Sequence, residues 1–108
     1  MLRYNTLENC DLQTIYATFS MAFSDYIVPM KPTFSQFENI LLRRGFNSAL
    51  SIGAFEEGQL VGFIFSSCRT WHDRKTLYTI SVGVIPSYRG RKIAENLYLA
   101  LFEIAKNA

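Results

Sequence analysis

The sequence contains few of the residues that build metal centres and disulfide frameworks. Its two cysteines, Cys10 and Cys68, lie far apart, and its only histidine is His72. Neither a CxxC pair nor another metal-ligand spacing occurs, so we predict no metal site. We expect both cysteines to be reduced thiols, and we therefore predict a cytoplasmic location.

Net charge and long apolar runs are also limited. The 108 residues carry a net charge of only +2, which argues against a polyanion-binding protein. No apolar run approaches the length of a membrane span, and the first residues lack the apolar stretch of a signal peptide. We therefore predict that the protein binds neither nucleic acid nor a membrane. Hydrophobic residues make up 49% of the chain, which is enough for the core of one domain.

A short strand and a helix are predicted at the start of the chain. The strand covers residues 2–7, and Asn9 or Asp11 then provides a capping side chain. Apolar residues follow at helical spacing, and we expect this helix to end near Asp25 and Tyr26.

A second helix is predicted after a proline-containing loop over residues 28–32. Thr33 and Gln36 fit a capping box at its start, and Gly45 is the expected C-terminal cap.

Three strands are predicted next. The first two cover residues 49–55 and 60–68, and the short turn between them favours an antiparallel hairpin. A polar loop is expected over residues 71–75, followed by a third strand over residues 76–85.

A last helix is expected from about Arg89, with one apolar face formed by Ile93, Leu97, Leu101, Ile104 and Ala108. The predicted order is β-α-α-β-β-β-α. Because the three consecutive strands have short connections, we predict an α+β fold in which helices flank an antiparallel sheet.

The junction between the third strand and the last helix carries the main chemical signal. The strand ends at Pro86, and Gly90 permits a tight turn before the helix. The first N–H groups of a helix lack internal partners and attract phosphate. Arg89, Arg91 and Lys92 add positive charge at this point, so the junction is a candidate anion site. A basic helix start without a ligand is the alternative.

This junction resembles the acetyl-CoA motif of the GNAT N-acetyltransferase superfamily. In that motif Arg or Gln, two variable residues, Gly, one variable residue, then Gly or Ala open a helix. Arg89 matches its first position and Ala94 its last, and Gly90 matches a glycine often found after the arginine. Residues 84–88 resemble the family's Val-x-Pro-x-Tyr approach. The element order is also similar, so the resemblance covers essentially all 108 residues.

The resemblance implies an acetyl-CoA cosubstrate and transfer of an acetyl group to a primary amine. The backbone of the third strand would hold the pantetheine arm, and the turn and helix start would bind pyrophosphate. The implied cofactor-binding residues are Val82, Gly83, Val84, Arg89, Gly90, Arg91, Lys92, Ile93 and Ala94. It also implies that residues 1–108 are a single domain that ends after the pyrophosphate-binding helix, which makes an incomplete acyl-CoA N-acyltransferase fold.

The sequence departs from the family pattern at two places within the chain. Lys92 stands where the motif has its middle glycine. In addition, residues 76–85 contain no acidic residue that could act as a general base.

The acceptor site is predicted on the loop after the first helix. Asp25 and Tyr26 are the candidate catalytic residues, with Trp71 as a weaker one. For Asp25 we favour a role as a helix-end or loop-capping carboxylate over an acceptor contact. For Tyr78 we expect core packing, and for His72 an exposed loop position. The expected acceptor is a small-molecule or peptide amine. A polyamine, an antibiotic, an amino acid and a protein N-terminus all remain candidates.

Two further hypotheses compete with the enzyme. The chain could be a non-catalytic acyl-CoA-binding or regulatory module that forms a homodimer through an uncovered sheet edge and helix face. Nucleic-acid binding through the basic cluster at residues 88–92 is disfavoured, because no recognised binding module surrounds that cluster.

Overall fold

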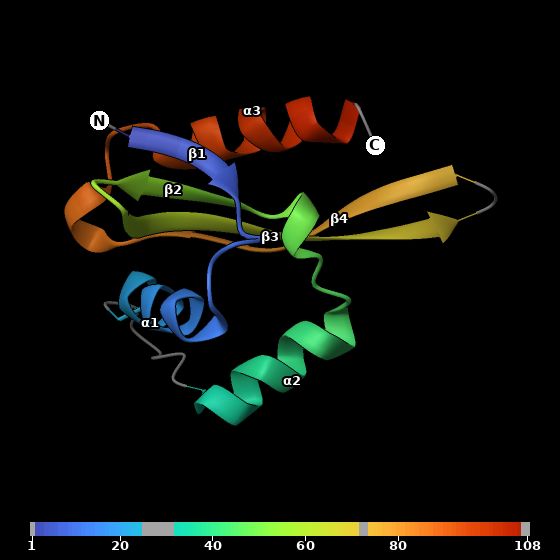
Figure 1. Ribbon diagram of the computed structural model, residues 1–108, viewed down its shortest axis with the longest axis horizontal. Coiled ribbons are helices and arrows are strands. Elements are labelled where there is room, and N and C mark those ends of the chain that lie inside the picture. The colour runs from blue at the N-terminus through green and yellow to red at the C-terminus, as the bar shows by residue number, and fades with distance from the viewer. Residues whose placement is uncertain (1, 25–31, 72–73, 107–108) are drawn as a thin grey trace.

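A computed structural model describes residues 2–24, 32–71 and 74–106 of the chain. The main elements follow the order β-α-α-β-β-β-α (Figure 1), as predicted. Short 3₁₀ turns, η1 and η2, precede β2 and α3. The bounds are β1 Leu2–Thr6, α1 Leu12–Ala22, α2 Phe34–Arg44, η1 Ser48–Leu50, β2 Ile52–Glu56, β3 Gln59–Trp71, β4 Arg74–Val84, η2 Pro86–Tyr88 and α3 Ile93–Lys106.

The four strands form one antiparallel sheet in the order β1-β2-β3-β4. Between β2 and β3, Glu57 and Gly58 have φ angles of 51° and 81°, the left-handed values typical of a two-residue hairpin turn. The β3–β4 hairpin extends well beyond the other two strands (Figure 1). Because β4 is last in the strand order, no described strand pairs with its outer side.

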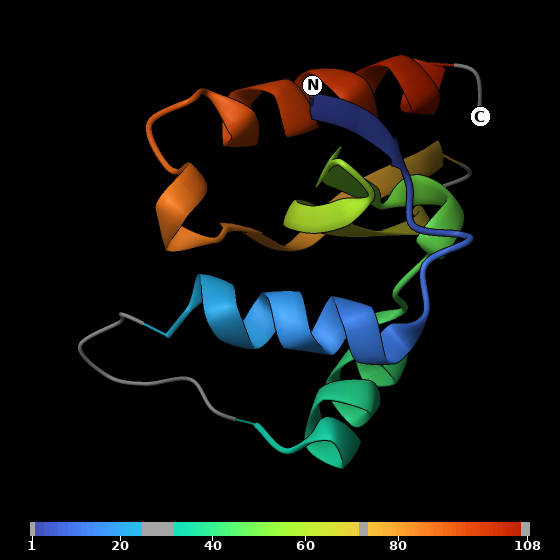
Figure 2. The ribbon, with the colours of Figure 1, turned by 60° about the vertical axis from the view of Figure 1, so that its left-hand side comes forward.

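Helices cover both faces of the sheet. Figure 2 shows α3 on one face, and α1 with α2 on the other. The core is accordingly divided into two clusters of buried side chains. The cluster beneath α1 and α2 is rich in aromatic rings and includes Phe19, Phe37, Phe63 and Phe65. The cluster beneath α3 is mainly aliphatic and includes Ile52, Ile64, Ile93, Leu97 and Leu101. The predicted α+β fold with a helix-flanked antiparallel sheet is therefore confirmed.

The two N-terminal helices begin where their capping residues predict. The Asp11 carboxylate accepts a hydrogen bond from the Thr14 backbone N–H at 2.7 Å, which lowers the pKa of Asp11 below its ordinary value. Thr33 and Gln36 form both hydrogen bonds of the capping box. Gly45 ends α2 in the left-handed conformation with φ 75°.

The prediction for the end of α1 was wrong. The helix stops at Ala22, because Phe23 leaves the helical conformation with φ −106° and ψ 13°. The Ser24 hydroxyl then donates to the Met21 carbonyl at 2.7 Å, which satisfies one of the last backbone acceptors of the helix. Asp25 and Tyr26, the predicted helix end and the candidate catalytic residues, lie outside the described residues.

The strand boundaries also differ from their predictions, most clearly at two places. Residues 48–50 form η1 because the Asn47 side chain accepts from the Ala49 N–H, so β2 begins at Ile52. The predicted polar loop at residues 71–75 is mostly strand, since Trp71 pairs with Arg74 in the ladder. His72 and Asp73 lie outside the described residues. Polar composition concealed the hairpin, because the sequence of residues 71–75 has no alternating apolar pattern.

Within the described residues no helix has the length and apolarity needed to span a membrane. The cytoplasmic location stays a prediction.

Leu41 and Leu42 allow a matched test of how α2 is attached. Leu41 is 4% exposed within the aromatic cluster, whereas its neighbour Leu42 is 73% exposed. Leu41→Ala should lower the free energy of unfolding by about 2–3 kcal/mol, because it leaves a cavity in the core. Leu42→Ala should change it by less than about 0.5 kcal/mol. Urea denaturation followed by circular dichroism measures both, and equal effects would contradict the packing described here.

Candidate functional site

The candidate site begins at the C-terminal end of β4. Val82, Gly83 and Val84 pair with β3 on one side. In an antiparallel strand, backbone groups point alternately to either side. Some N–H and C=O groups of this segment therefore point away from β3, where no described strand accepts them. Such an edge can bind an extended ligand through main-chain hydrogen bonds.

Gly83 allows a close approach between β4 and α1. A Cβ atom at Gly83 would lie 2.7 Å from Cζ of Phe63 and 3.2 Å from Cβ of Ala22. Any larger residue would therefore force the end of α1, or the Phe63 ring, away from the strand. The glycine predicted to hold a cofactor is thus also required for packing.

The turn after β4 differs from its prediction. The helix was expected from about Arg89 but begins at Ile93. Two left-handed residues move the start of the helix to Ile93, since Gly90 has φ 84° and Lys92 has φ 59°. Such residues interrupt a right-handed helix. Lys92 then acts as the N-terminal cap residue, because its carbonyl accepts from the Asn96 N–H at 3.1 Å.

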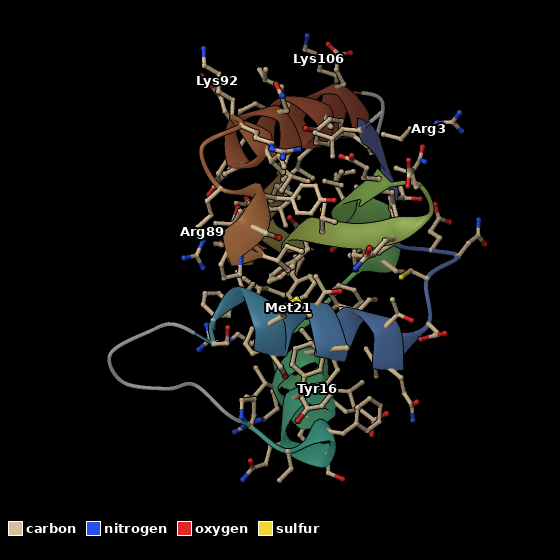
Figure 3. All side chains as sticks on the ribbon, turned by 90° about the vertical axis from the view of Figure 1, so that its left-hand side faces the viewer. Arg3, Tyr16, Met21, Arg89, Lys92 and Lys106 are labelled. Atoms are coloured by element: carbon tan, nitrogen blue, oxygen red, sulfur yellow. The ribbon has the colours of Figure 1, made fainter. Side chains whose placement is uncertain are left out.

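The start of α3 is suited to binding an anion. The N–H groups of Ile93, Ala94 and Glu95 precede the first N–H that has a helical partner. The Lys92 side chain is exposed and projects away from the body of the protein (Figure 3). The backbone of the turn therefore stays accessible, although Lys92 occupies the position of the motif's middle glycine.

Arg91 is held beside the turn by two contacts. Its Nη1 atom lies 4.0 Å from Oε2 of Glu56. Its guanidinium carbon lies 4.8 Å from the centre of the Tyr88 ring, a distance typical of a cation–π contact. The side chain is still 55% exposed, so its charge remains available to a ligand at the turn.

Arg89 connects three parts of the site. Its Nη2 atom donates to the Ala22 carbonyl at the end of α1, and its Nε atom donates to the Val84 carbonyl at 3.2 Å. Figure 3 shows Arg89 between the turn and α1. The guanidinium therefore fixes the turn to both β4 and α1. Sequence reasoning predicted a cofactor contact at Arg89 and missed this structural role.

A groove with a volume of about 1050 Å³ lies next to this edge, between α2 and the β3–β4 hairpin. It extends along β4 from Tyr78 to Ser81, and Ser81 directly precedes the cofactor-binding segment. Phe65 pairs with Ser81 and Ser66 with Thr79, so Ile80 is the extra residue of a β-bulge. The bulge lets consecutive residues, Ile80 and Ser81, both line the groove.

The structure accounts for only some of the predicted acceptor residues. Asp25, Tyr26 and His72 lie outside the described residues. Tyr78 was expected in the core, but it is 45% exposed and lines the groove. Trp71 lies at the hairpin end of β3, seven positions along the strand from Ile64, which pairs with Val82.

Sequence reasoning also missed Arg43 and Arg44, which line the groove from the last turn of α2. Their spacing from the apolar Ile40 and Leu41 was a usable signal, because residues three or four apart share a helix face. Among the described residues, no group of three or more His, Cys, Asp or Glu side chains could hold a metal ion.

Comparison with known proteins identifies the family. Residues 12–108 match the model of the acetyltransferase (GNAT) family. The chain belongs to the GNAT family. No curated protein matches it.

Solved structures of GNAT proteins share its fold. A GNAT acetyltransferase from Brucella melitensis in complex with acetyl-CoA has a TM-score of 0.75 and 17% identity, and the match covers 100% of this chain and 71% of that one. A ribosomal-protein-alanine N-acetyltransferase from Brucella melitensis biovar Abortus gives 0.76 and 20%, covering 99% and 73%. An aminoglycoside acetyltransferase from an uncultured soil metagenomic sample gives 0.71 and 24%, also covering 99% and 73%.

The left-handed conformation of Lys92 leads to a test of the GNAT motif. Glycine adopts this conformation without a steric penalty, whereas a residue with Cβ does not. Lys92→Gly should therefore be more stable than Lys92→Ala by about 1 kcal/mol, since both variants lack the ammonium group. Chemical denaturation of the two variants measures the difference. A glycine variant less stable than the alanine variant would contradict the strained backbone.

The connecting role of Arg89 can be tested against Arg91 in the same turn. Arg89→Ala should lower the free energy of unfolding by about 1–2 kcal/mol, because two backbone carbonyls lose a charged donor. Arg91→Ala should cost about 0.5 kcal/mol, since the Arg91 side chain is itself 55% exposed and its ion pair is screened by solvent. Thermal and urea denaturation of both variants provide the measurement. If Arg91→Ala is as destabilising as Arg89→Ala, the connecting role of Arg89 is contradicted.

Proposed function

We propose that this chain binds acetyl-CoA and belongs to an N-acetyltransferase that acetylates a primary amine. The observation that carries the proposal is the direct succession of an open strand edge, a left-handed turn and the start of α3. The GNAT family match supports it. A GNAT neighbour with the same fold was solved with acetyl-CoA bound.

The cofactor would lie along β4 with its phosphates at the turn. The N–H groups of residues 91–94 would bind pyrophosphate, because helix starts attract anions. The outward backbone groups of Val82 to Val84 would hold the pantetheine arm as a neighbouring strand would. Since β4 runs toward the turn, the thioester would lie farther back along the strand, near Ser81 and the bulge at Ile80.

In the proposed reaction, the amine nitrogen forms a bond to the acetyl carbonyl carbon and the carbon–sulfur bond breaks. The amine loses a proton, and the departing thiolate takes one up. An outward N–H of β4 would stabilise the negative charge that develops on the carbonyl oxygen. Placing the amine beside the thioester would supply much of the rate. Asp25 and Tyr26 remain the proposed catalytic residues.

We further propose that the chain forms the N-terminal part of one GNAT domain, whose sheet continues on the open side of β4. Three exposed apolar side chains on α3, Tyr98, Leu99 and Phe102, support a further packing surface. A second copy is the alternative occupant, in a non-catalytic dimer. Light scattering coupled to gel filtration tests the dimer, and a monomer at micromolar concentration would rule it out.

Ala94 offers a sharp test of the cofactor site. Ala94→Asp places a negative charge among the free N–H groups of α3, where it favours the helix but repels pyrophosphate. The neutral, similarly shaped Ala94→Asn is the matched control. We expect the aspartate variant to be at least as stable as the asparagine variant and to bind acetyl-CoA at least about tenfold more weakly.

Calorimetric titration with acetyl-CoA measures binding, and thermal denaturation measures stability. Equal affinities of the two variants would place the phosphates elsewhere. Absence of acetyl-CoA binding by the parent chain would contradict the proposed function itself.

A further inference from the structure

The groove beside β4 has a composition that selects its ligand. Its walls are largely apolar, with Phe19, Phe37 and Phe65 contributing aromatic rings. Among the lining residues that the structure describes, the charged ones are Arg43 and Arg44, and none is acidic. The described part of the groove therefore combines an apolar interior with a net positive charge. A polycationic acceptor would meet repulsion from this lining, whereas an anionic group would be attracted.

The arginines lie at a defined end of the groove. They occupy the last turn of α2, and the chain is attached to the sheet three residues later, where the Asn47 N–H donates to the Ser66 carbonyl at 2.9 Å. Ser66 and Ser67 pair with Thr79 and Tyr78. The α2 end is thus located near the Tyr78 part of β4, away from the segment that follows Ser81.

The opposite end of the groove meets the cofactor edge. Ser81 lines the groove and directly precedes Val82. Ser67 and Phe65, the pairing partners of Tyr78 and Ser81, are two residues apart, so the span along the sheet is roughly 7 Å, because the bulge residue Ile80 adds little length. An acceptor whose amine lies near Ser81 would therefore place its carboxylate at the arginines if the two groups were several ångströms apart.

We propose that the acceptor is a small primary amine with an apolar body and a free carboxylate, of the size of an apolar dipeptide. This inference rests on the proposed acetyltransferase function and specifies its substrate class. The amine and carboxylate of an extended dipeptide are separated by roughly 7 Å, at about 3.5 Å per residue. Its side chains would contact the aromatic walls, and its carboxylate would pair with the guanidinium groups of α2, which favour carboxylates.

A second explanation accounts equally for Arg43 and Arg44 at the end of α2. Basic side chains in the last turn of a helix also stabilise the helix dipole. That role predicts an effect on stability without an effect on ligand charge preference. The two explanations therefore separate when binding of charged and neutral ligands is compared.

The experiment uses the dipeptide leucyl-phenylalanine and its C-terminal amide, which differ in the carboxylate charge. Binding to the whole chain is measured by NMR titration without acetyl-CoA, so the result does not depend on cofactor binding. We expect the acid to bind about five- to tenfold more tightly than the amide. Arg44→Gln and the double variant Arg43→Gln/Arg44→Gln should progressively remove this preference.

Arg3→Gln is the matched control. Arg3 is exposed on β1, at the opposite edge of the sheet from β4, and does not line the groove. It should retain the preference of the parent chain. Circular dichroism establishes that each variant is folded, and a variant that fails this criterion is replaced by the corresponding Met substitution, which also removes the charge but keeps an unbranched side chain.

The proposal would be overturned by equal binding of acid and amide, by a preference that survives the double variant, or by tighter binding of spermidine than of the dipeptide. Acetyl-CoA binding is titrated separately. If acetyl-CoA binds but the dipeptide does not, the substrate class is wrong and the proposed function stands. If the dipeptide binds with the expected preference but acetyl-CoA does not, the groove is correct and the acetyltransferase proposal fails.

Discussion

The close contact between the end of α1 and β4 determines the arrangement of the site. Gly83 permits it, because a side chain there would collide with Phe63 and crowd Ala22. Arg89 secures it, by donating to the Ala22 carbonyl from the turn that follows β4. One small residue and one long one thus bring the end of α1 together with a strand edge and a turn that lie far from it in sequence. The cofactor edge and the groove both border this contact.

The local signals in the sequence were sufficient to predict most elements. Capping predicts helix starts well because it depends on side chains within three or four residues, as at Asp11 and at Thr33 with Gln36. The β2–β3 hairpin was predictable for the same reason. Each of these features is determined by residues that lie within about one turn of it in the sequence.

The features that could not be predicted depend on distant contacts or on unusual backbone conformations. Nothing local marks Lys92 as left-handed, so the start of α3 was placed too early. The role of Arg89 requires Ala22, which is 67 residues away. The groove is formed by α2 and the hairpin together, so the exposure of Tyr78 follows from tertiary packing that an alternating strand pattern does not contain.

The bulge at Ile80 explains how one strand can serve both parts of the site. A regular strand directs successive side chains to opposite faces. The additional residue lets Ile80 and Ser81 both line the groove, after which the alternation resumes at Val82, which packs toward α3, and Gly83, which faces α1. The groove therefore ends where the open backbone edge begins. A ligand bound in the groove and one bound along the edge would meet at Ser81, and this shared boundary is the geometric requirement for transferring a group between them.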